Sequence, residues 1–218
     1  MLDRAEIERF IRAAGYEAKT PVAVGVSLPS GSPVLVAWGE RPDAPQFDTE
    51  TIAYAGSLAK QMTGACAALL ARDGALDLDA PIANWLPGLP AWSKRIRVRH
   101  LIHHTAGLPD TDTVWAEMER AGEAHCDALC ISRALHTPGS LDDGTPLDYA
   151  WGVRTFRAAG LVVHSHGGTW EGQAAKLVRL PTRRASFAVI ACDSSVIRMA
   201  ALSSALQDAL VGSTSPTP

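Results

Sequence analysis

Residues 57–74 read SLAKQMTGACAALLARDG, a stretch that is dominated by alanine and leucine. These residues favour a helix, and Gly74 stands where helices commonly end. Ser57 lies at the start of the expected helix, and Lys60 follows one turn later on the same side. The stretch therefore predicts a helix over residues 57–73 that brings a hydroxyl and an amine close together.

Residues that favour strands lie on both sides of this helix. Before it, Val22–Val26 and Val34–Trp38 are separated by a turn of proline, serine and glycine, which predicts a hairpin. After it come four further strand-like runs: Tyr149–Phe156, Leu161–His166, Ala174–Leu180 and Phe187–Asp193. We expect turns between these runs at Gly160, Gly167–Gly168, Gly172 and Pro181.

Amphipathic segments at the two ends of the chain indicate helices that cover a sheet. One such helix is expected over residues 3–14, and in the closing helix Ile197, Ala201, Ala205 and Leu210 fall near one side. Between the strands, Asp79 is expected near a helix cap and residues 111–136 are expected to be helical. The fold class is α+β, an α/β sandwich whose antiparallel sheet is built from the N-terminal hairpin and the C-terminal strands and is flanked by terminal helices.

Composition supports an ordinary folded protein. The 218 residues are 47% apolar and 20% charged, which is enough for a normal core. We expect a single domain over residues 1–211, a shortened helical part at 57–136 and a disordered tail at 212–218. The net charge of −3 gives no reason to expect a nucleic acid or an anionic membrane surface as partner.

The location of the protein is inferred from its first residues and its cysteines. The start, MLDRAEIERF, carries acids where a secretion signal needs a basic end followed by an apolar run. The chain also has no stretch of about 20 apolar residues that could span a membrane. We expect a cytoplasmic protein with free thiols, and the four-residue spacing of Cys126 and Cys130 does not match a zinc knuckle.

Two short motifs carry residues that could catalyse a reaction. A desolvated Lys60 could accept the proton of Ser57, although a serine and a lysine three residues apart often occur by chance. In His164–Thr169, which reads HSHGGT, the glycines could let a substrate lie against the backbone, and an amide just beyond them could stabilise an oxyanion. The structural alternative for this second motif is a tight hairpin with exposed histidines.

Other histidines are weaker candidates. His104 could act as a base, but a helix-end histidine that bonds locally is the favoured interpretation. A metal-dependent hydrolase would have to use His103, His104, His164 and His166. Since no set of carboxylates completes a zinc site, we expect neither a metal nor a cofactor.

The order of several motifs resembles the superfamily of serine β-lactamases and penicillin-binding proteins, and most closely its class C β-lactamase-like branch. The S-x-x-K helix is followed by G-x-L-x-L-D-x-P, by W-L-P and by R-H-L-x-x-H-T-x-G-L-P, and HGGTWEG near the C-terminus is similar to that branch's H-x-G strand. The resemblance implies that Ser57 is an acylated nucleophile and that Lys60 helps to deprotonate it. It also implies that His166, Gly167, Gly168 and Thr169 form the substrate strand, with the amides of Ser57 and Thr169 as the oxyanion hole.

One part of the family's pattern is missing. The family carries a Y-x-N motif on a helical subdomain, whereas none of the three tyrosines of this chain begins Y-x-N. Only residues 110–143 separate Pro109 from Gly144, so most of that subdomain and one wall of the cleft are absent. An open groove would leave Lys60 solvated, and the exposed apolar surface would be covered by residues 111–136 or by a second chain, which suggests a homodimer.

Two functions follow from these observations. The first is a serine hydrolase that acts on a small ester or amide through an acyl-Ser57 intermediate, with Lys60 as base and His166 as a second polar contact or substitute proton carrier. An ester is preferred to a β-lactam because the asparagine that grips the lactam side chain has no counterpart. The alternative is a catalytically impaired remnant of the fold that serves as a binding or assembly module.

Overall fold

The computed structural model describes residues 2–40, 47–86, 89, 91–107, 140–141 and 143–212. The predicted helix at 111–136, Cys126, Cys130 and all of the predicted tail except Gly212 lie outside these residues. The chain divides into two compact units, Met1–Ala59 with Val153–Pro218 as unit 1 and Lys60–Gly152 as unit 2. The single domain over residues 1–211 stays a prediction, and each unit is described by itself.

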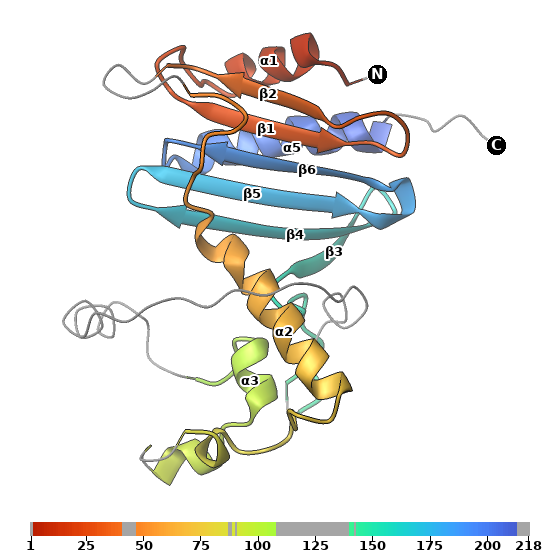
Figure 1. The fold of residues 1–218 in the computed structure, drawn as a ribbon. Coiled ribbons are helices and arrows are strands. Elements are labelled where there is room, and N and C mark those ends of the chain that lie inside the picture. The colour runs from red at the N-terminus through yellow and green to blue at the C-terminus, as the bar shows by residue number, and fades with distance from the viewer. Residues whose placement is uncertain are drawn as a thin grey trace. The chain divides into compact units, whose positions relative to one another are not determined.

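Unit 1 is built on one six-stranded antiparallel sheet in the order β2-β1-β6-β5-β4-β3 (Figure 1). Its strands are β1 (Val22–Ser27), β2 (Val34–Trp38), β3 (Arg154–Ala158), β4 (Leu161–Trp170), β5 (Gln173–Leu180) and β6 (Ala185–Ala191). The N-terminal hairpin joins the C-terminal strands through β1 and β6, with Val22 opposite Ala191 and Val26 opposite Phe187. The predicted α+β fold, with one sheet assembled from both ends of the chain, is confirmed.

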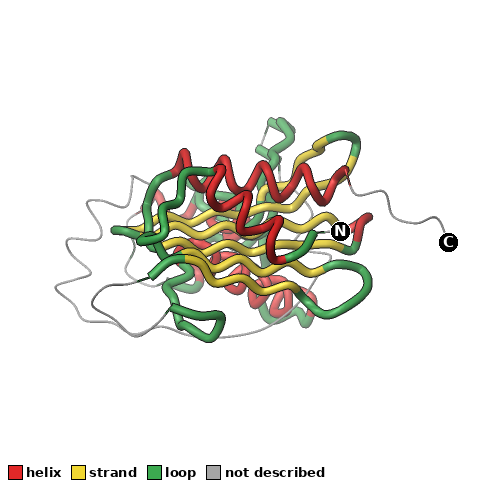
Figure 2. The backbone as a smooth tube through the Cα atoms, turned by 90° about the horizontal axis from the view of Figure 1, so that it is seen from above, coloured by secondary structure: helices red, strands yellow, loops and turns green. Residues whose placement is uncertain are grey.

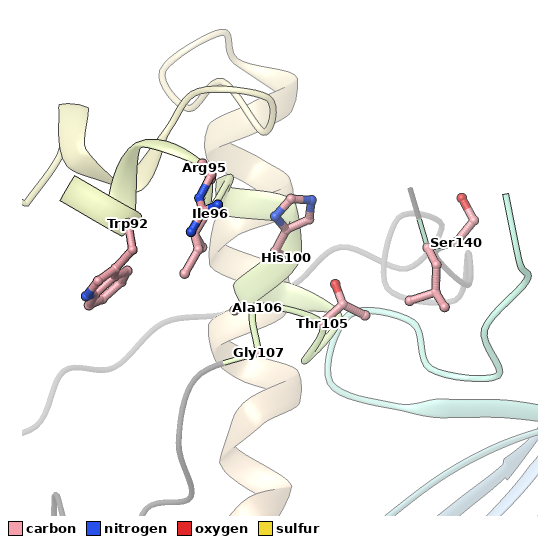
Figure 3. Close-up of a pocket in the computed structure, with 9 residues that line it drawn as sticks. Trp92, Arg95, Ile96, His100, Thr105, Ala106, Gly107 and Ser140 are labelled. Atoms are coloured by element: carbon pink, nitrogen blue, oxygen red, sulfur yellow. The ribbon is translucent and has the colours of Figure 1, made fainter. Parts of the chain in front are cut away.

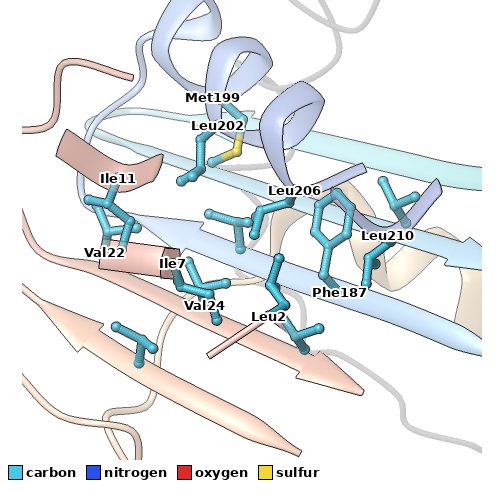
Figure 4. Packing of buried hydrophobic residues seen from close by; sticks show 14 of the residues in the cluster. Leu2, Ile7, Ile11, Val22, Val24, Phe187, Met199, Leu202, Leu206 and Leu210 are labelled. Atoms are coloured by element: carbon cyan, nitrogen blue, oxygen red, sulfur yellow. The ribbon is translucent and has the colours of Figure 1, made fainter. Parts of the chain in front are cut away.

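Two helices, α1 (Arg4–Ala13) and α5 (Val196–Gly212), cover one face of this sheet (Figures 1 and 2). Alternate residues of the strands point toward them, so that Val22, Val24 and Phe187 are almost completely buried. The helices contribute Ile7 and Ile11 from α1 and Met199, Leu202, Leu206 and Leu210 from α5 (Figure 4). These side chains form the core that fixes the sheet.

The prediction of which residues of the closing helix face the sheet was largely wrong. Ile197 is 83% exposed and Ala201 is also exposed, whereas Leu210 is buried as expected. The buried side of α5 instead follows the larger side chains at Met199, Leu202 and Leu206, which are also spaced by three and four residues. These side chains remove more apolar area from water than alanines do, so they decide which side faces the sheet. Gly212, predicted to begin the disordered tail, is the last residue of α5.

Strand β4 is longer than the sequence predicted. It continues through Gly167 and Gly168, which pair with Lys176 and Ala175 of β5, and it ends at Trp170. The predicted turn at these glycines was therefore wrong, because both adopt extended backbone. Strand β3 pairs with β4 only as far as Ser165, so within the described residues no strand pairs with the outer edge of residues 166–170. Residues 149–153, expected in the same strand as Phe156, precede β3.

Unit 2 contains helices α2 (Lys60–Arg72) and α3 (Val98–Ile102) and the short 3₁₀ helices η2 (Ile82–Asn84) and η3 (Ala91–Lys94). Asp79 does not cap a helix as predicted, because η2 begins only after Pro81. Its carboxylate instead pairs with Arg97, at 3.6 Å, and with Arg99. Within the described residues, no helix is long and apolar enough to cross a membrane.

The start of α5 yields a stability prediction. Asp193 accepts hydrogen bonds from Ser195 N at 2.9 Å and from Arg198 Nε at 2.5 Å, and these bonds lower the pKa of its carboxyl group. We expect Asp193→Asn to lower the free energy of unfolding at pH 7 by about 1 kcal/mol. Because the folded-state pKa is depressed, the contribution of Asp193 is present above its unfolded pKa of about 3.9 and is lost as the pH falls further.

Urea unfolding at pH 7 and pH 3 measures this difference. The matched control is Asp208→Asn, since Asp208 is exposed on α5 and forms no ion pair among the described residues. The difference in the free energy of unfolding between the wild type and Asp193→Asn should be smaller at pH 3 than at pH 7. Asp208→Asn should have the free energy of unfolding of the wild type at both pH values. A difference that is as large at pH 3 as at pH 7 would contradict the stabilising role of the ionised Asp193 carboxylate.

Candidate active site

Ser57 lies on a single 3₁₀ turn, η1 (Gly56–Ala59), and Lys60 is the first residue of α2. The predicted helix over residues 57–73 therefore begins with a 3₁₀ turn. The turn is closed by a hydrogen bond from Leu58 N to Ala55 O at 3.2 Å. Ser57 is half-buried in unit 1, and it belongs to a different unit from Lys60.

The Ser57 turn packs directly on the backbone of β4. A Cβ added to Gly168 would lie 2.8 Å from Ser57 N and 3.3 Å from Ala55 O, distances that a side chain does not tolerate. Gly167 has the opposite orientation, since neighbouring residues of a strand point to opposite faces. A Cβ there would lie 3.6 Å from Lys176 Cδ, which is an ordinary contact. The two glycines therefore have different roles, and only Gly168 is required by the Ser57 turn.

A pocket of about 230 Å³ in unit 1 contains four of the six predicted site residues. Ser57, Gly167, Gly168 and Thr169 line it, together with Ala175, Lys176, Val196, Met199, Ala200 and Ser203. His166 does not line this pocket; it is half-buried one residue earlier on β4. The pocket adjoins the part of β4 whose outer edge pairs with no strand among the described residues, so Ser57 and residues 167–169 line one space beside this edge.

Lys176 is a pocket residue that the sequence pattern did not reveal. It lies on β5 between Ala174 and Val178, which are its nearest residues on the same face of the strand. Both of these residues belong to the core. Burial lowers the pKa of its amine, and the charge of Arg154 lowers it further. A lysine at an inward position of an alternating strand was the signal that could have revealed it.

The second histidine of β4, His164, is held inside the sheet. His164 is 6% exposed, and its Nδ1 lies 3.0 Å from Thr155 Oγ1 of β3. Because both His164 and His166 lie within β4, the alternative of a tight hairpin with exposed histidines is wrong. Among the residues that the structure describes, no group of three or more metal-ligating side chains is close enough to hold an ion.

In unit 2, Lys60 is exposed at the rim of a second pocket, of about 220 Å³, which His104 also lines. The pKa of His104 is lowered by burial and by the charge of Lys60. His104 follows α3, donates its backbone N–H to Leu101 O and sets its ring edge-on to Tyr149 at 5.0 Å. It therefore bonds locally at the end of a helix, as expected.

Glycines also fix the backbone around Lys60. A Cβ at Gly152 would lie 2.5 Å from Lys60 O, and a Cβ at Gly64 would lie 2.4 Å from Trp151 O. Helix α2 thus rests on the backbone of residues 151–152. The position of the Lys60 backbone is set by this contact, while its side chain reaches solvent.

A third and larger pocket, of about 500 Å³, lies elsewhere in unit 2 (Figure 3). It is lined by Trp92, Arg95, Ile96, His100, Thr105, Ala106, Gly107, Ser140 and Leu141. None of the six predicted site residues lines it. The candidate site is therefore the smaller pocket that contains Ser57.

Comparison with known proteins places these observations in context. The family described as Beta-lactamase matches residues 7–142, which is more than half of the chain. Penicillin-binding protein 4* of Bacillus subtilis (strain 168) is 33% identical over 73 residues, which are 34% of this chain and only 16% of that protein. Ser57 and Lys60 lie inside the family match, whereas residues 166–169 lie beyond it.

Solved structures agree with the fold. The D-amino acid amidase from Ochrobactrum anthropi SV3, in complex with L-phenylalanine, has a TM-score of 0.70 and 14% identity, with 96% of this chain and 99% of that chain covered. A class C β-lactamase from Rhodobacter sphaeroides has a TM-score of 0.69 and 15% identity, with 94% and 99% covered. At this identity the similarity shows the fold alone.

The contact at Gly168 gives a paired test. We expect Gly168→Ala to lower the free energy of unfolding by about 1–3 kcal/mol, because the new methyl group must push the Ser57 turn away. The matched control, Gly167→Ala, adds the same methyl group where the nearest atom is 3.6 Å away, so its effect should be smaller. Urea unfolding of both variants measures the difference. Equal stability of the two variants would contradict the proposed contact.

Proposed function

This chain belongs to the beta-lactamase family, and we propose that it is a serine hydrolase that cleaves a small ester or amide through an acyl-Ser57 intermediate. Members of this family are serine hydrolases that form an acyl-enzyme. The observation that carries the proposal is the pocket that Ser57 shares with Gly168 and Thr169 beside the open edge of β4. The choice of an ester as the substrate and the roles of the individual residues are proposals as well.

In the proposed reaction, Ser57 Oγ attacks the carbonyl carbon of the substrate and Lys60 accepts the serine proton. The carbonyl oxygen becomes an oxyanion, which accepts hydrogen bonds from the backbone N–H groups of Ser57 and Thr169. Donors of this kind are typically worth about 3–4 kcal/mol each. The leaving group then departs with the proton that Lys60 took from Ser57. Water next attacks the acyl-Ser57 ester, gives one proton back to Ser57 through Lys60, and releases the acid. His166 is proposed as a second polar contact or proton carrier.

The alternative, a catalytically impaired remnant used for binding or assembly, is favoured by one observation. Lys60 is exposed, whereas a lysine that serves as a general base is normally buried enough for its amine to be neutral and able to accept a proton. A homodimer could supply such cover and stays a proposal. Light scattering on the purified chain would test it.

A covalent probe separates the two functions. We expect a fluorophosphonate to add one phosphonyl group to the wild type at Ser57, because Ser57 lines the pocket. Ser57→Ala should give no adduct, and Lys60→Met should slow the reaction by about 100-fold or more, the usual effect of losing a general base. Intact-protein and peptide mass spectrometry measure both.

The matched control is Ser204→Ala, which removes an exposed serine of α5. This variant should react like the wild type. A folded wild-type protein that forms no adduct at Ser57 would rule out the hydrolase and leave the remnant.

A further inference from the structure

Exposed apolar side chains of unit 1 gather near the Ser57 pocket. Tyr54 is 52% exposed and lies three residues before Ser57, and Trp170 is 47% exposed and directly follows Thr169. Val196, which lines the pocket itself, is 67% exposed. Surface aromatic residues are normally scattered, so a concentration beside a nucleophile points to a ligand with an apolar part.

Tyr54 and Trp170 contact each other and form a corner. Their ring centroids are 6.5 Å apart and their planes are tilted by 59°. A third flat ring placed in such a corner can stack on one ring and meet the other with its edge, which are the two favoured arrangements of aromatic pairs. Because each ring is about half exposed, its open surface is available to a ligand.

The corner is held in a fixed position relative to the Ser57 turn. Trp170 ends β4 and pairs with Gln173 of β5, and both rings adjoin Gly56 and Gly168 in a recess that has no room for a water molecule. The Tyr54 ring lies 3.7 Å from the point where a Cβ on Gly56 would be. The aromatic rings therefore pack on the same backbone that carries the proposed oxyanion donors.

The other face of β4 is less suited to an apolar group. Gly167 points to the face opposite Gly168 and Trp170, and the Lys176 amine lies 3.9 Å from the position of a Cβ there. A lysine amine is costly to cover with an apolar ring, because the ring removes water without offering a hydrogen bond. An apolar substituent is thus better accommodated on the face of β4 that carries Trp170.

We propose that Tyr54 and Trp170 form an aromatic platform that binds an aryl group on the acyl side of the substrate, next to the carbonyl that Ser57 attacks. This proposal rests on the proposed function, since it assigns the specificity of the same site. It names a substrate class, esters or amides of arylacetic and similar acids, and two specificity-determining residues.

Two sulfonyl fluorides that modify serine provide the test. Phenylmethanesulfonyl fluoride carries an aryl group and methanesulfonyl fluoride does not, and mass spectrometry follows the rate at which each labels Ser57. The ratio of the two rates in the wild type is the reference, so differences in intrinsic reactivity cancel. We expect Trp170→Ala and Tyr54→Ala each to lower this ratio by about 3- to 10-fold and Trp170→Phe to lower it less.

The matched control is Phe156→Ala, which removes a partly exposed aromatic ring from β3. It should keep the wild-type ratio, and thermal unfolding confirms that each variant is folded. A ratio that is unchanged in Trp170→Ala and Tyr54→Ala, or that falls equally in Phe156→Ala, overturns the platform while Ser57 labelling still supports the hydrolase. No labelling of Ser57 by either reagent or by a fluorophosphonate overturns the proposed function and the platform together.

Discussion

The candidate site depends on the contact between Gly168 of β4 and the turn that carries Ser57. A side chain at position 168 would meet Ser57 N at 2.8 Å, so the turn can rest on the strand only where none is present. This contact brings two backbone segments together, one before the nucleophile and one along β4. Backbone amides on such segments are positioned by the sheet itself and not by flexible side chains, which suits the preorganised donors that an oxyanion needs.

Among the described residues, the sheet also leaves one edge of β4 without a partner strand beside the candidate site. Strand β3 covers only five residues and β4 covers ten, so pairing between them stops at Ser165. On its other side, β4 pairs with β5 from His164, opposite Arg179, to Trp170, opposite Gln173. Along residues 166–170, no strand of the described residues pairs with the other edge of β4, which is the kind of edge that an extended peptide or substrate can join. The lengths of two neighbouring strands therefore decide where this edge begins.

The sequence predicted the parts of this arrangement that follow from local pattern. The hairpin, the strands and the terminal helices follow from alternation and spacing. The roles of Ser57, Lys60 and His166 follow only from the resemblance in motif order to a known family, and they stay predictions. The glycines were misjudged as a turn. Gly167 and Gly168 both lie in an extended strand, and Gly168 is required there by its contact with the Ser57 turn, which is distant in sequence. Lys176, which lines the Ser57 pocket, and Tyr54 and Trp170, which line a separate recess beside Gly168, were missed for the same reason. Strand register and the packing of η1 on β4 place them there.

The two halves of the proposed chemistry differ in how well the described residues support them. The proposed oxyanion donors are backbone groups in unit 1, whereas the proposed base, Lys60, belongs to unit 2 and is exposed. A general base usually contributes about 10²–10⁴ to the rate, and an oxyanion donor contributes about 10²–10³. If the base is the weaker half, substrates with good leaving groups are favoured, because a phenolate or similar anion can depart without a proton while an amine cannot. This asymmetry gives a physical reason to expect activated esters, and not amides, as the first substrates that the chain turns over.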